Sequence, residues 1–396
     1  LVGPELLVRE RRSAIHLAGR RFDYPLRMTN VLARLEPWVG ARIVADWLVA
    51  RRKRWPPERS FADWVERRFG RTLYRMFFEN YTAKLWGIPP GHLSADWAGQ
   101  RIGLPDLSDV LRRLLGREDE GPRTYARRYL YPRTGIGRIY ERMAEEVRAL
   151  GGRILTGATA ARIRTEGDRV RAVVARTPDG PLELEAGAVL SSIPLPELHA
   201  AADAASGAAP EAARLRFRAM RFLDVLLDGE EVTPYTWIYL PERRYLATRI
   251  QEPRHRSPDC APPGRTSLML ELPCEVGDAV WEASDRELLA RVRRDLARIG
   301  IDLGGRVLGV FSTRAEHAYP VYHLDYRRDR DRVLESLARF GNLATAGRQG
   351  LFRYVWMDQA ILMGRSALAR LTGEPGAPAS SIGLEEGLAE ARSVIG

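Results

Sequence analysis

Apolar and polar positions follow different periods in different parts of the chain. Residues 13–24 (SAIHLAGRRFDY) contain two short apolar runs around an Ala-Gly pair, which predicts two strands joined by a turn. From about 30 to 115 the apolar spacing becomes helical. Ser60 is placed to cap a helix that carries Phe61, Trp64, Val65 and Phe69 on one side, with Gly70 at its end. The charged stretch 116–127 has no period and predicts a loop.

A compact passage of alternating helix and strand follows. Gly137 is expected to begin a helix that Gly151-Gly152 ends, with Ile139, Met143, Val147 and Leu150 on one face. Ile154-Leu155 predicts the start of a strand. The runs 169–176 and 182–185 predict a hairpin across Pro178-Asp179-Gly180, and 188–192 has the continuous apolar character of a buried strand.

From about 200 to 325 the chain is mixed. Strand-like runs occur at 222–227, 235–240, 245–250 and 266–272. Ser284 and Glu287 predict a capping box that begins a helix carrying Leu288, Leu289, Val292 and Leu296. Near the end, 343–346 is a short apolar strand that Gly347 breaks. A last helix starts at about Asp358, whose side chain is suited to the N-cap.

Strands and helices of one layer therefore occur at the start, in the middle and at the end of the sequence, with other blocks between them. This order predicts an α/β (α+β) protein with a discontinuous nucleotide-binding domain, a helical insertion and a second domain on a mixed or antiparallel sheet. The expected segments are 1–29, 30–128, 129–199, 200–330 and 331–396.

Composition narrows the class of protein. The 396 residues are 45% hydrophobic and 29% charged, as in globular proteins, and no apolar run reaches the roughly 18 residues of a membrane span. The formal charge is +11, but arginines are spread along the chain, which argues against a nucleic-acid partner. The densest basic run, Arg51–Trp55, fits a solvated helix end and leaves peripheral contact with lipid headgroups as an alternative.

Cysteine and histidine usage gives no sign of a disulfide framework or a metal site. Cys260 and Cys274 are the only cysteines, which fits a reducing, cytoplasmic setting. The closest histidine pair, His317 and His323, lacks the spacing of a zinc site, and no cysteines accompany it. We therefore expect no metal.

Four segments are considered as candidates for binding chemistry. Gly347-Arg348-Gln349-Gly350 lies between a strand and a helix, where backbone amides and an arginine can meet a phosphate; a turn with a surface arginine is the alternative. The N-terminus of the Asp358 helix could stabilise negative charge. YPRTGIG (131–137) has Tyr140 where a third glycine would stand, so it fails as a dinucleotide fingerprint. The aromatic run at 81–87 predicts core packing or a wall against a planar ligand.

Taken together, these pieces resemble one family. Residues 69–71 (FGR), 77–90 (FFENYTAKLWGIPP), 94–97 (SADW) with 100–102 (QRI), 131–137 (YPRTGIG), 191–194 (SSIP), 315–322 (AEHAYPVY) and 347–354 (GRQGLFRY) with Met357-Asp358 occur in the family's order. They are similar to FAD-dependent oxidoreductases of the amine-oxidase-like superfamily, related to protoporphyrinogen oxidases and UDP-galactopyranose mutases.

This resemblance implies FAD as the cofactor and assigns site residues by position. Gly347 and Arg348 would meet the FAD diphosphate. Met357, Asp358 and Gln359 would lie at the pyrimidine end of the flavin, and Gly135 and Ser192 near the cofactor. Ala160 stands where the family's backbone touches adenine. Arg133, Tyr319 and Tyr322 are candidates for lining the substrate side, and no catalytic base is identified.

Two departures bear on function. Family members begin with a strand, G-x-G-x-x-G and a helix, whereas this sequence opens downstream of them; we expect a chain without that phosphate dock. Residues 354–359 (YVWMDQ) also replace a pattern with paired asparagines and a histidine. The leading prediction is oxidation of a small molecule by hydride transfer to flavin N5. The alternatives are a UDP-galactopyranose-mutase-like isomerase, with Arg133, Arg249, Tyr319 and Tyr322 gripping a diphosphate, and a flavin-free fragment without catalysis. The oligomeric state is left open.

Overall fold

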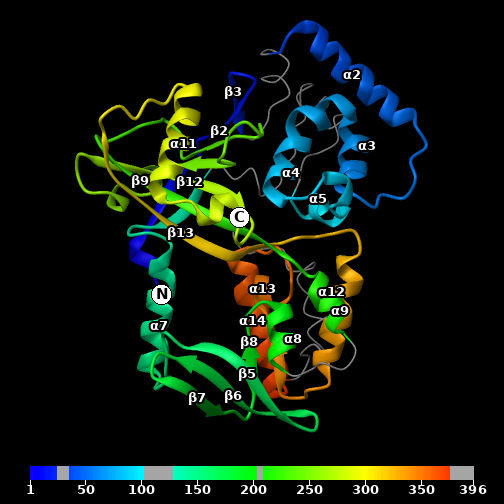
Figure 1. The fold of residues 1–396 in the computed structure, drawn as a ribbon, viewed down its shortest axis with the longest axis vertical. Helices are drawn as coiled ribbons and strands as arrows, with labels where there is room; N and C mark the ends of the chain where they lie inside the picture. The colour runs from blue at the N-terminus through cyan, green and yellow to red at the C-terminus, as the bar shows by residue number, and fades with distance from the viewer. Residues whose placement is uncertain (25–34, 102–127, 203–207, 375–396) are drawn as a thin grey trace. The chain divides into compact units, whose positions relative to one another are not determined.

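The computed structural model describes residues 1–24, 35–101, 128–202 and 208–374, and these form two compact units (Figure 1). Unit 1 comprises Leu1–Arg153 and Arg218–Glu316, and unit 2 comprises Ile154–Phe217 and His317–Gly396. Each unit is therefore built from two separate stretches of chain. The predicted loop at 116–127 lies outside the described residues.

Unit 1 is built on a seven-stranded mixed sheet in the order β13-β9-β12-β11-β10-β2-β3. β2 runs parallel to β10, whereas β10–β11, β11–β12, β12–β9 and β2–β3 are antiparallel. The predicted α/β class with a mixed sheet is confirmed. The strands are β2 (Ser13–Leu17), β3 (Arg20–Tyr24), β9 (Phe217–Asp228), β10 (Trp237–Tyr239), β11 (Arg249–Gln251), β12 (Arg265–Cys274) and β13 (Val307–Pro320).

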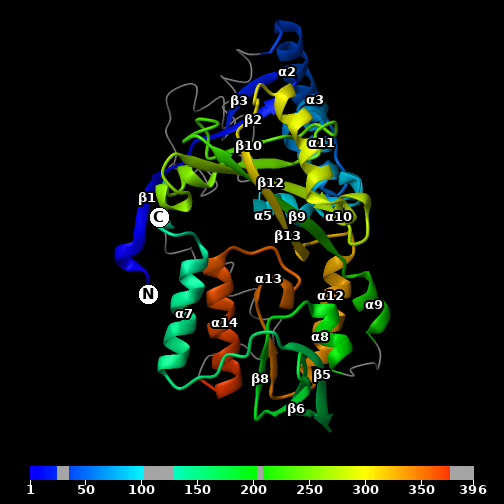
Figure 2. The same cartoon turned by 60° about the vertical axis from the view of Figure 1, so that its left-hand side comes forward.

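One face of this sheet forms the hydrophobic core of unit 1. Strand side chains alternate between faces, so every second residue points to that core. Helix α11 (Asp285–Arg298) covers it, as Figure 2 shows, and begins at the predicted Ser284–Glu287 capping box. The core side chains from β9 to β12 are Leu223, Val225, Leu227, Ile238, Ile250, Leu268, Leu270 and Leu272, and those from α11 are Leu288, Val292 and Leu296.

A helical block is inserted after β3. It contains α2 (Pro37–Arg52), α3 (Phe61–Leu73), a π-helical turn η2 (Tyr74–Glu79), α4 (Asn80–Trp86) and α5 (Ala95–Arg101). Ser60 caps α3 through a reciprocal bond with Asp63, as predicted for this position. At Gly70 the helix kinks with φ +79°, and a Cβ there would lie 2.9 Å from the backbone of Asp46 and Trp47. A glycine is therefore needed where α2 and α3 approach.

The block is tied to the sheet by Lys84 on α4. Its ammonium donates to the carbonyls of Leu240 (3.0 Å), Glu242 (3.2 Å) and Ala247 (2.5 Å). Burial lowers the pKa of Lys84 to about 7.

Unit 1 also contains a two-stranded ribbon of β1 (Leu6–Glu10) and β4 (Arg128–Pro132). Its other elements are α7 (Gly137–Ala149), α10 (Ala279–Glu282) and the 3-10 turns Gly3–Glu5, Pro90–His92, Pro253–His255 and Pro258–Cys260.

Unit 2 contains an antiparallel sheet of β5 (Thr159–Glu166), β6 (Arg169–Thr177) and β7 (Gly180–Glu185), which confirms the predicted hairpin. The predicted strand start at Ile154-Leu155 is wrong. These two residues are 39% and 42% exposed, and the first strand begins only at Thr159. Two apolar residues cannot specify a strand without a partner to pair with.

A parallel pair, β8 (Val189–Ser191) and β14 (Leu343–Thr345), forms the other sheet of unit 2. The Asn342 amide links the two sheets by bonding to both backbone groups of Val170 and to the carbonyl of Gly187. The helices are α8 (Leu195–Ala201), α9 (Ala209–Arg214), α12 (Tyr326–Ala338), α13 (Gly347–Gly350) and α14 (Met357–Thr372). None of the helices in the described residues has the length and hydropathy needed to cross a bilayer.

Candidate functional site

The carboxyl ends of β8 and β14 lie side by side in unit 2. Thr345 stands opposite Ser191 in the parallel register, and the Ala346 N–H donates to the Ser191 carbonyl at 2.9 Å. The chain therefore leaves the sheet at Ser192 and at Gly347 along the same edge. In open parallel sheets, ligands bind at this edge.

The segment after β14 packs closely against its neighbours at Gly350. A Cβ on Gly350 would lie 2.5 Å from Thr345 Oγ1 and 3.5 Å from Ser192 Cα. The same Thr345 hydroxyl donates to the Gly350 carbonyl at 3.0 Å. Gly347 has φ +82°, and a Cβ there would meet nothing within 4 Å. The backbone at Gly347 therefore faces open space at the end of the strands.

Arg348 is held among aromatic rings. Its guanidinium donates to the Val355 carbonyl at 2.7 Å and to the Ala318 carbonyl at 3.5 Å. It also lies 4.5 Å from the ring centre of Tyr354 and 5.7 Å from that of Tyr319, and these two rings stack at 5.6 Å. A guanidinium has five N–H donors in a fixed plane, so these contacts orient the group and leave further donors.

The first turn of α14 differs from the prediction at Asp358. The helix begins at Met357 with Trp356 as its N-cap, and Gln359 Oε1 accepts from the Trp356 N–H at 3.1 Å. Asp358 is thus inside the first turn rather than at the cap. The prediction was wrong by two positions because the longer Gln359 side chain can reach back to the backbone, as in a capping box.

The other predicted site residues are distributed over both units. Tyr322 is fully buried, stacked at 4.1 Å on Tyr326, and its hydroxyl accepts from the Tyr354 N–H at 2.6 Å. Ala160 lies on β5 opposite Ala175. Gly135, with φ +106°, and Arg133, paired with Asp259 at 3.1 Å, belong to unit 1. Their predicted roles stay predictions.

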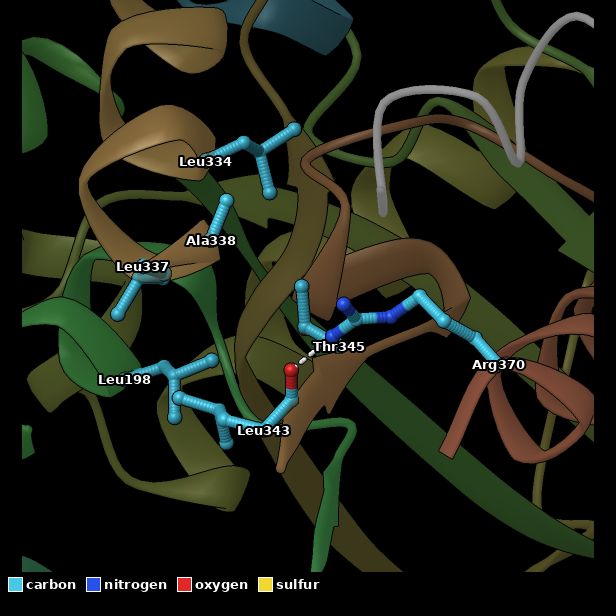
Figure 3. A pocket seen from close by; sticks show the side chains of 7 residues that line it. All are labelled: Leu198, Leu334, Leu337, Ala338, Leu343, Thr345 and Arg370. Atoms are coloured by element: carbon cyan, nitrogen blue, oxygen red, sulfur yellow. Dashed lines mark hydrogen bonds between the residues drawn. The ribbon is translucent and has the colours of Figure 1, made fainter. Parts of the chain in front are cut away.

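A small apolar pocket lies beside β14 (Figure 3). Arg370 of α14 points into it and donates to the Leu343 carbonyl, and burial lowers the pKa of Arg370. The arginine therefore satisfies a strand edge that would otherwise be open. Packing explains this pocket, whose lining residues are Leu198, Leu334, Leu337, Ala338, Leu343, Thr345 and Arg370.

A second candidate site is the face of the unit 1 sheet opposite its core. Cross-strand pairing places Trp237, Gln251, Met269 and Asp224 in one row across β10, β11, β12 and β9. The next row contains Tyr239, Arg249, Glu271 and Phe222. Aromatic and charged side chains thus alternate with the core leucines along the same strands.

This face carries polar groups whose bonding capacity is not used. Arg256, which follows the turn Pro253–His255, lies 5.5 Å from the Trp237 ring and donates to Gln251 Oε1. Among the described residues, the buried Trp237 Nε1–H and Arg256 Nε–H have no hydrogen-bond partner. The Glu271 carboxylate, by contrast, accepts hydrogen bonds from Arg249 at 2.5 Å and from Gln251. Asp224 forms no hydrogen bond or ion pair within that part of the chain, and burial raises its pKa to about 6. Unsatisfied donors and a desolvated acid on one face make it a candidate binding site.

Comparison with known proteins identifies the family. The sequence matches the flavin containing amine oxidoreductases over residues 50–371. The chain belongs to this family. The resemblance seen in the motifs is thereby confirmed, and FAD is the cofactor. No curated protein sequence matches the chain significantly.

Solved structures of flavin enzymes share the fold. A reduced UDP-galactopyranose mutase is 20% identical with a TM-score of 0.80, covering 95% of this chain and 81% of that one. A protein described as a protoporphyrinogen oxidase, from Exiguobacterium sp. 255-15, is 18% identical with a TM-score of 0.68 (98% and 83% covered). Cyclohexylamine oxidase from Brevibacterium oxydans IH-35A is 12% identical with a TM-score of 0.60 (94% and 83%). At these identities the likeness concerns the fold.

The donor set at the ends of β8 and β14 fits the family's cofactor. FAD carries a diphosphate, and an open backbone at Gly347 beside the oriented Arg348 guanidinium suits an anionic oxygen. The sheet-face residues Asp224, Trp237, Gln251 and Arg256 were not identified from sequence. For Asp224 the available signal was a single acidic residue within the apolar run 222–227, and its meaning depends on the strand order.

Proposed function

We propose that FAD binds in unit 2 at the carboxyl ends of β8 and β14. The observation that carries this proposal is the Gly347–Gly350 turn, where Gly350 packs closely against its neighbours and a half-buried arginine follows the strand. The residues proposed to hold the cofactor there are Ser192, Gly347, Arg348, Met357, Asp358 and Gln359. Ala160 on β5 is the proposed backbone contact for adenine, as the family motifs imply.

We further propose that the polar face of the unit 1 sheet binds the substrate, a small molecule. The orphan N–H groups of Trp237 and Arg256 suit an acceptor on the ligand. Asp224 lies three strands away, about 14 Å at the usual strand spacing, and its carboxylate suits a proton-bearing amine or hydroxyl. With its pKa raised to about 6, the Asp224 carboxyl can exchange a proton close to neutral pH.

We assign the reaction to the oxidoreductase class. When bound, FAD would supply a two-electron acceptor for a hydride from a substrate C–H bond. The protein's residues orient the substrate and hold its proton. A redox-neutral isomerisation of the mutase type is the second candidate. It differs in consuming no acceptor, so bleaching of the flavin by substrate without a reductant supports the oxidoreductase.

The cofactor site is tested by changing Arg348 to alanine. Loss of a charge-assisted contact is expected to weaken FAD binding by about 1.5–3 kcal/mol, or roughly ten- to a hundredfold. Titration with FAD, followed by flavin fluorescence, measures the affinity. Arg365→Ala is the matched control because Arg365 is an exposed arginine of the neighbouring α14. If both variants bind FAD as the unchanged chain does, Arg348 does not contact the cofactor.

A further inference from the structure

Helix α2 presents apolar side chains on two opposite sides. Ile43, Trp47 and Ala50 are buried. On the other side, Trp38 and Val49 are 64% and 65% exposed, and the exposed apolar set also includes Val44 and Leu48. A surface helix of a globular protein normally turns a polar face to solvent. This one carries an apolar stripe there instead.

The stripe is continuous because its members recur with the helical period. Trp38, Ala41, Ala45 and Leu48 are three or four residues apart and follow one line along the helix, and all four are exposed. Asp46, the sole acidic residue in the α2 sequence, is turned away and accepts from the Thr72 backbone N–H (3.0 Å) and hydroxyl (2.6 Å). No acidic side chain of α2 therefore interrupts the stripe.

A basic cluster follows the stripe at the C-terminal end of α2. Arg51, Arg52, Lys53 and Arg54 are consecutive and exposed. Three of them help to line a surface hollow in which Glu58 is the one acidic residue, and Glu58 is already paired with Arg68 at 2.7 Å and Arg67 at 3.2 Å. The lining residues are Ala50, Arg51, Lys53, Arg54, Trp55, Glu58, Arg67 and Arg68. Positive charge in and around the hollow exceeds negative charge.

Two tryptophan rings contact cationic side chains of the basic cluster. The Trp55 indole N–H donates to the Ala50 carbonyl at 2.8 Å, which fixes its ring beneath Lys53 at 4.1 Å. Arg51 lies 5.0 Å from the Trp47 ring. The half-buried Trp55 ring beside Lys53 is amphipathic and suits the boundary between hydrocarbon and headgroups, whereas the buried Trp47 only holds Arg51 in place.

We propose that α2 and Arg51–Trp55 form a docking surface for an anionic membrane. The stripe enters the headgroup boundary, and the cluster meets lipid phosphates. Apolar burial and attraction to anionic lipid reinforce each other in such surfaces.

A second copy of the chain fits this surface less well. Parallel pairing of two α2 helices would bring two basic clusters together, which is repulsive. Antiparallel pairing would set the four cationic side chains of each cluster against a single carboxylate at the N-terminus of the other helix, Glu36, which already lies 4.0 Å from Arg20. An anionic lipid surface can bury the apolar stripe and neutralise the positive charge of the basic cluster.

The experiment is co-sedimentation of the full chain with vesicles. One set contains phosphatidylcholine alone, and the other contains phosphatidylcholine mixed with phosphatidylserine. Binding to the mixed vesicles and weak binding to the neutral ones are expected. Changing Arg51, Arg52 and Arg54 to glutamine should weaken binding to mixed vesicles about fivefold per side chain, or roughly a hundredfold together. The matched control changes Arg286, Arg291 and Arg294, three exposed arginines of α11, to glutamine.

A second variant tests the stripe. Trp38→Ser with Leu48→Ser should weaken binding to mixed vesicles, whereas Val276→Ser, at a site 58% exposed elsewhere in unit 1, should not. Circular dichroism confirms that each variant is folded. Equal binding by the basic variant and its α11 control overturns the proposal, as does absence of binding to mixed vesicles. Concentration-dependent self-association lost in the Trp38/Leu48 variant would instead assign the stripe to a second copy.

Discussion

Gly350 offers a sharp test of the packing that shapes the proposed cofactor site. A methyl group at this position would stand 2.5 Å from Thr345 Oγ1, a distance at which one of the two must move. Overpacking of this kind typically costs about 1–3 kcal/mol. We therefore expect Gly350→Ala to lower the free energy of unfolding by that amount and to reduce FAD content, because Ser192 and Gly347 lie on the same edge.

A double-mutant cycle separates the steric conflict from other effects. Thr345→Ala alone should cost about 1 kcal/mol, since the Gly350 carbonyl loses its hydrogen bond. Thr345→Ala also removes the hydroxyl that would collide with the methyl group of Gly350→Ala. The double variant should therefore lose little more unfolding free energy than Thr345→Ala alone. A favourable coupling of about 1–2 kcal/mol is expected.

Denaturant unfolding and thermal melting measure these differences, and flavin absorbance measures FAD content. Gly341→Ala is the control, because Gly341 is exposed in the same unit and a Cβ there meets nothing within 4 Å. Its effect should stay within about 0.5 kcal/mol. If Gly350→Ala is as stable as Gly341→Ala, or if the two changes at 345 and 350 are simply additive, the close contact is not present.

Two further predictions concern titration. Burial lowers the pKa of Lys84 to about 7, so between about pH 7 and 10 the unfolded chain binds more protons and stability should rise with pH, by at most about 1.4 kcal/mol per unit. Urea unfolding at several pH values measures this rise in the free energy of unfolding. Lys84→Met should flatten it and Lys53→Met should not. If the free energy rises with pH equally in both variants, Lys84 is not its source. For Asp224, whose pKa is raised to about 6, stability should fall as pH rises from about 4 to 6, because the folded state holds the proton. Asp224→Asn should remove that fall in stability and should also change the pH dependence of anaerobic flavin reduction by an amine. Asp228→Asn, on the same strand, is the control and should change neither. If Asp224→Asn leaves the pH profile of flavin reduction unchanged, Asp224 is not part of the substrate site.

Local patterns determined much of the secondary structure. The Ser60 and Ser284 caps, the helix from Gly137, the hairpin at 169–185 and the strand before Gly347 were predicted because each depends on residues close in sequence. The family could be recognised for a related reason: its motifs keep their order along the chain, and order is visible without a structure. The strand predicted at Ile154-Leu155 was wrong because its signal was only two residues long. The N-cap predicted at Asp358 was wrong because the cap depends on how far the Gln359 side chain reaches.

Tertiary structure alone decided which distant residues meet. The row of Trp237, Gln251, Met269 and Asp224 exists only because β10, β11, β12 and β9 pair in that register, and register depends on contacts across the sheet. The sequence likewise shows the apolar and basic residues of α2 but not which side α3 covers. Burial and orphaned polar groups are properties of the packed chain, so the candidate substrate face and the exposed stripe could be found only after folding had placed their neighbours.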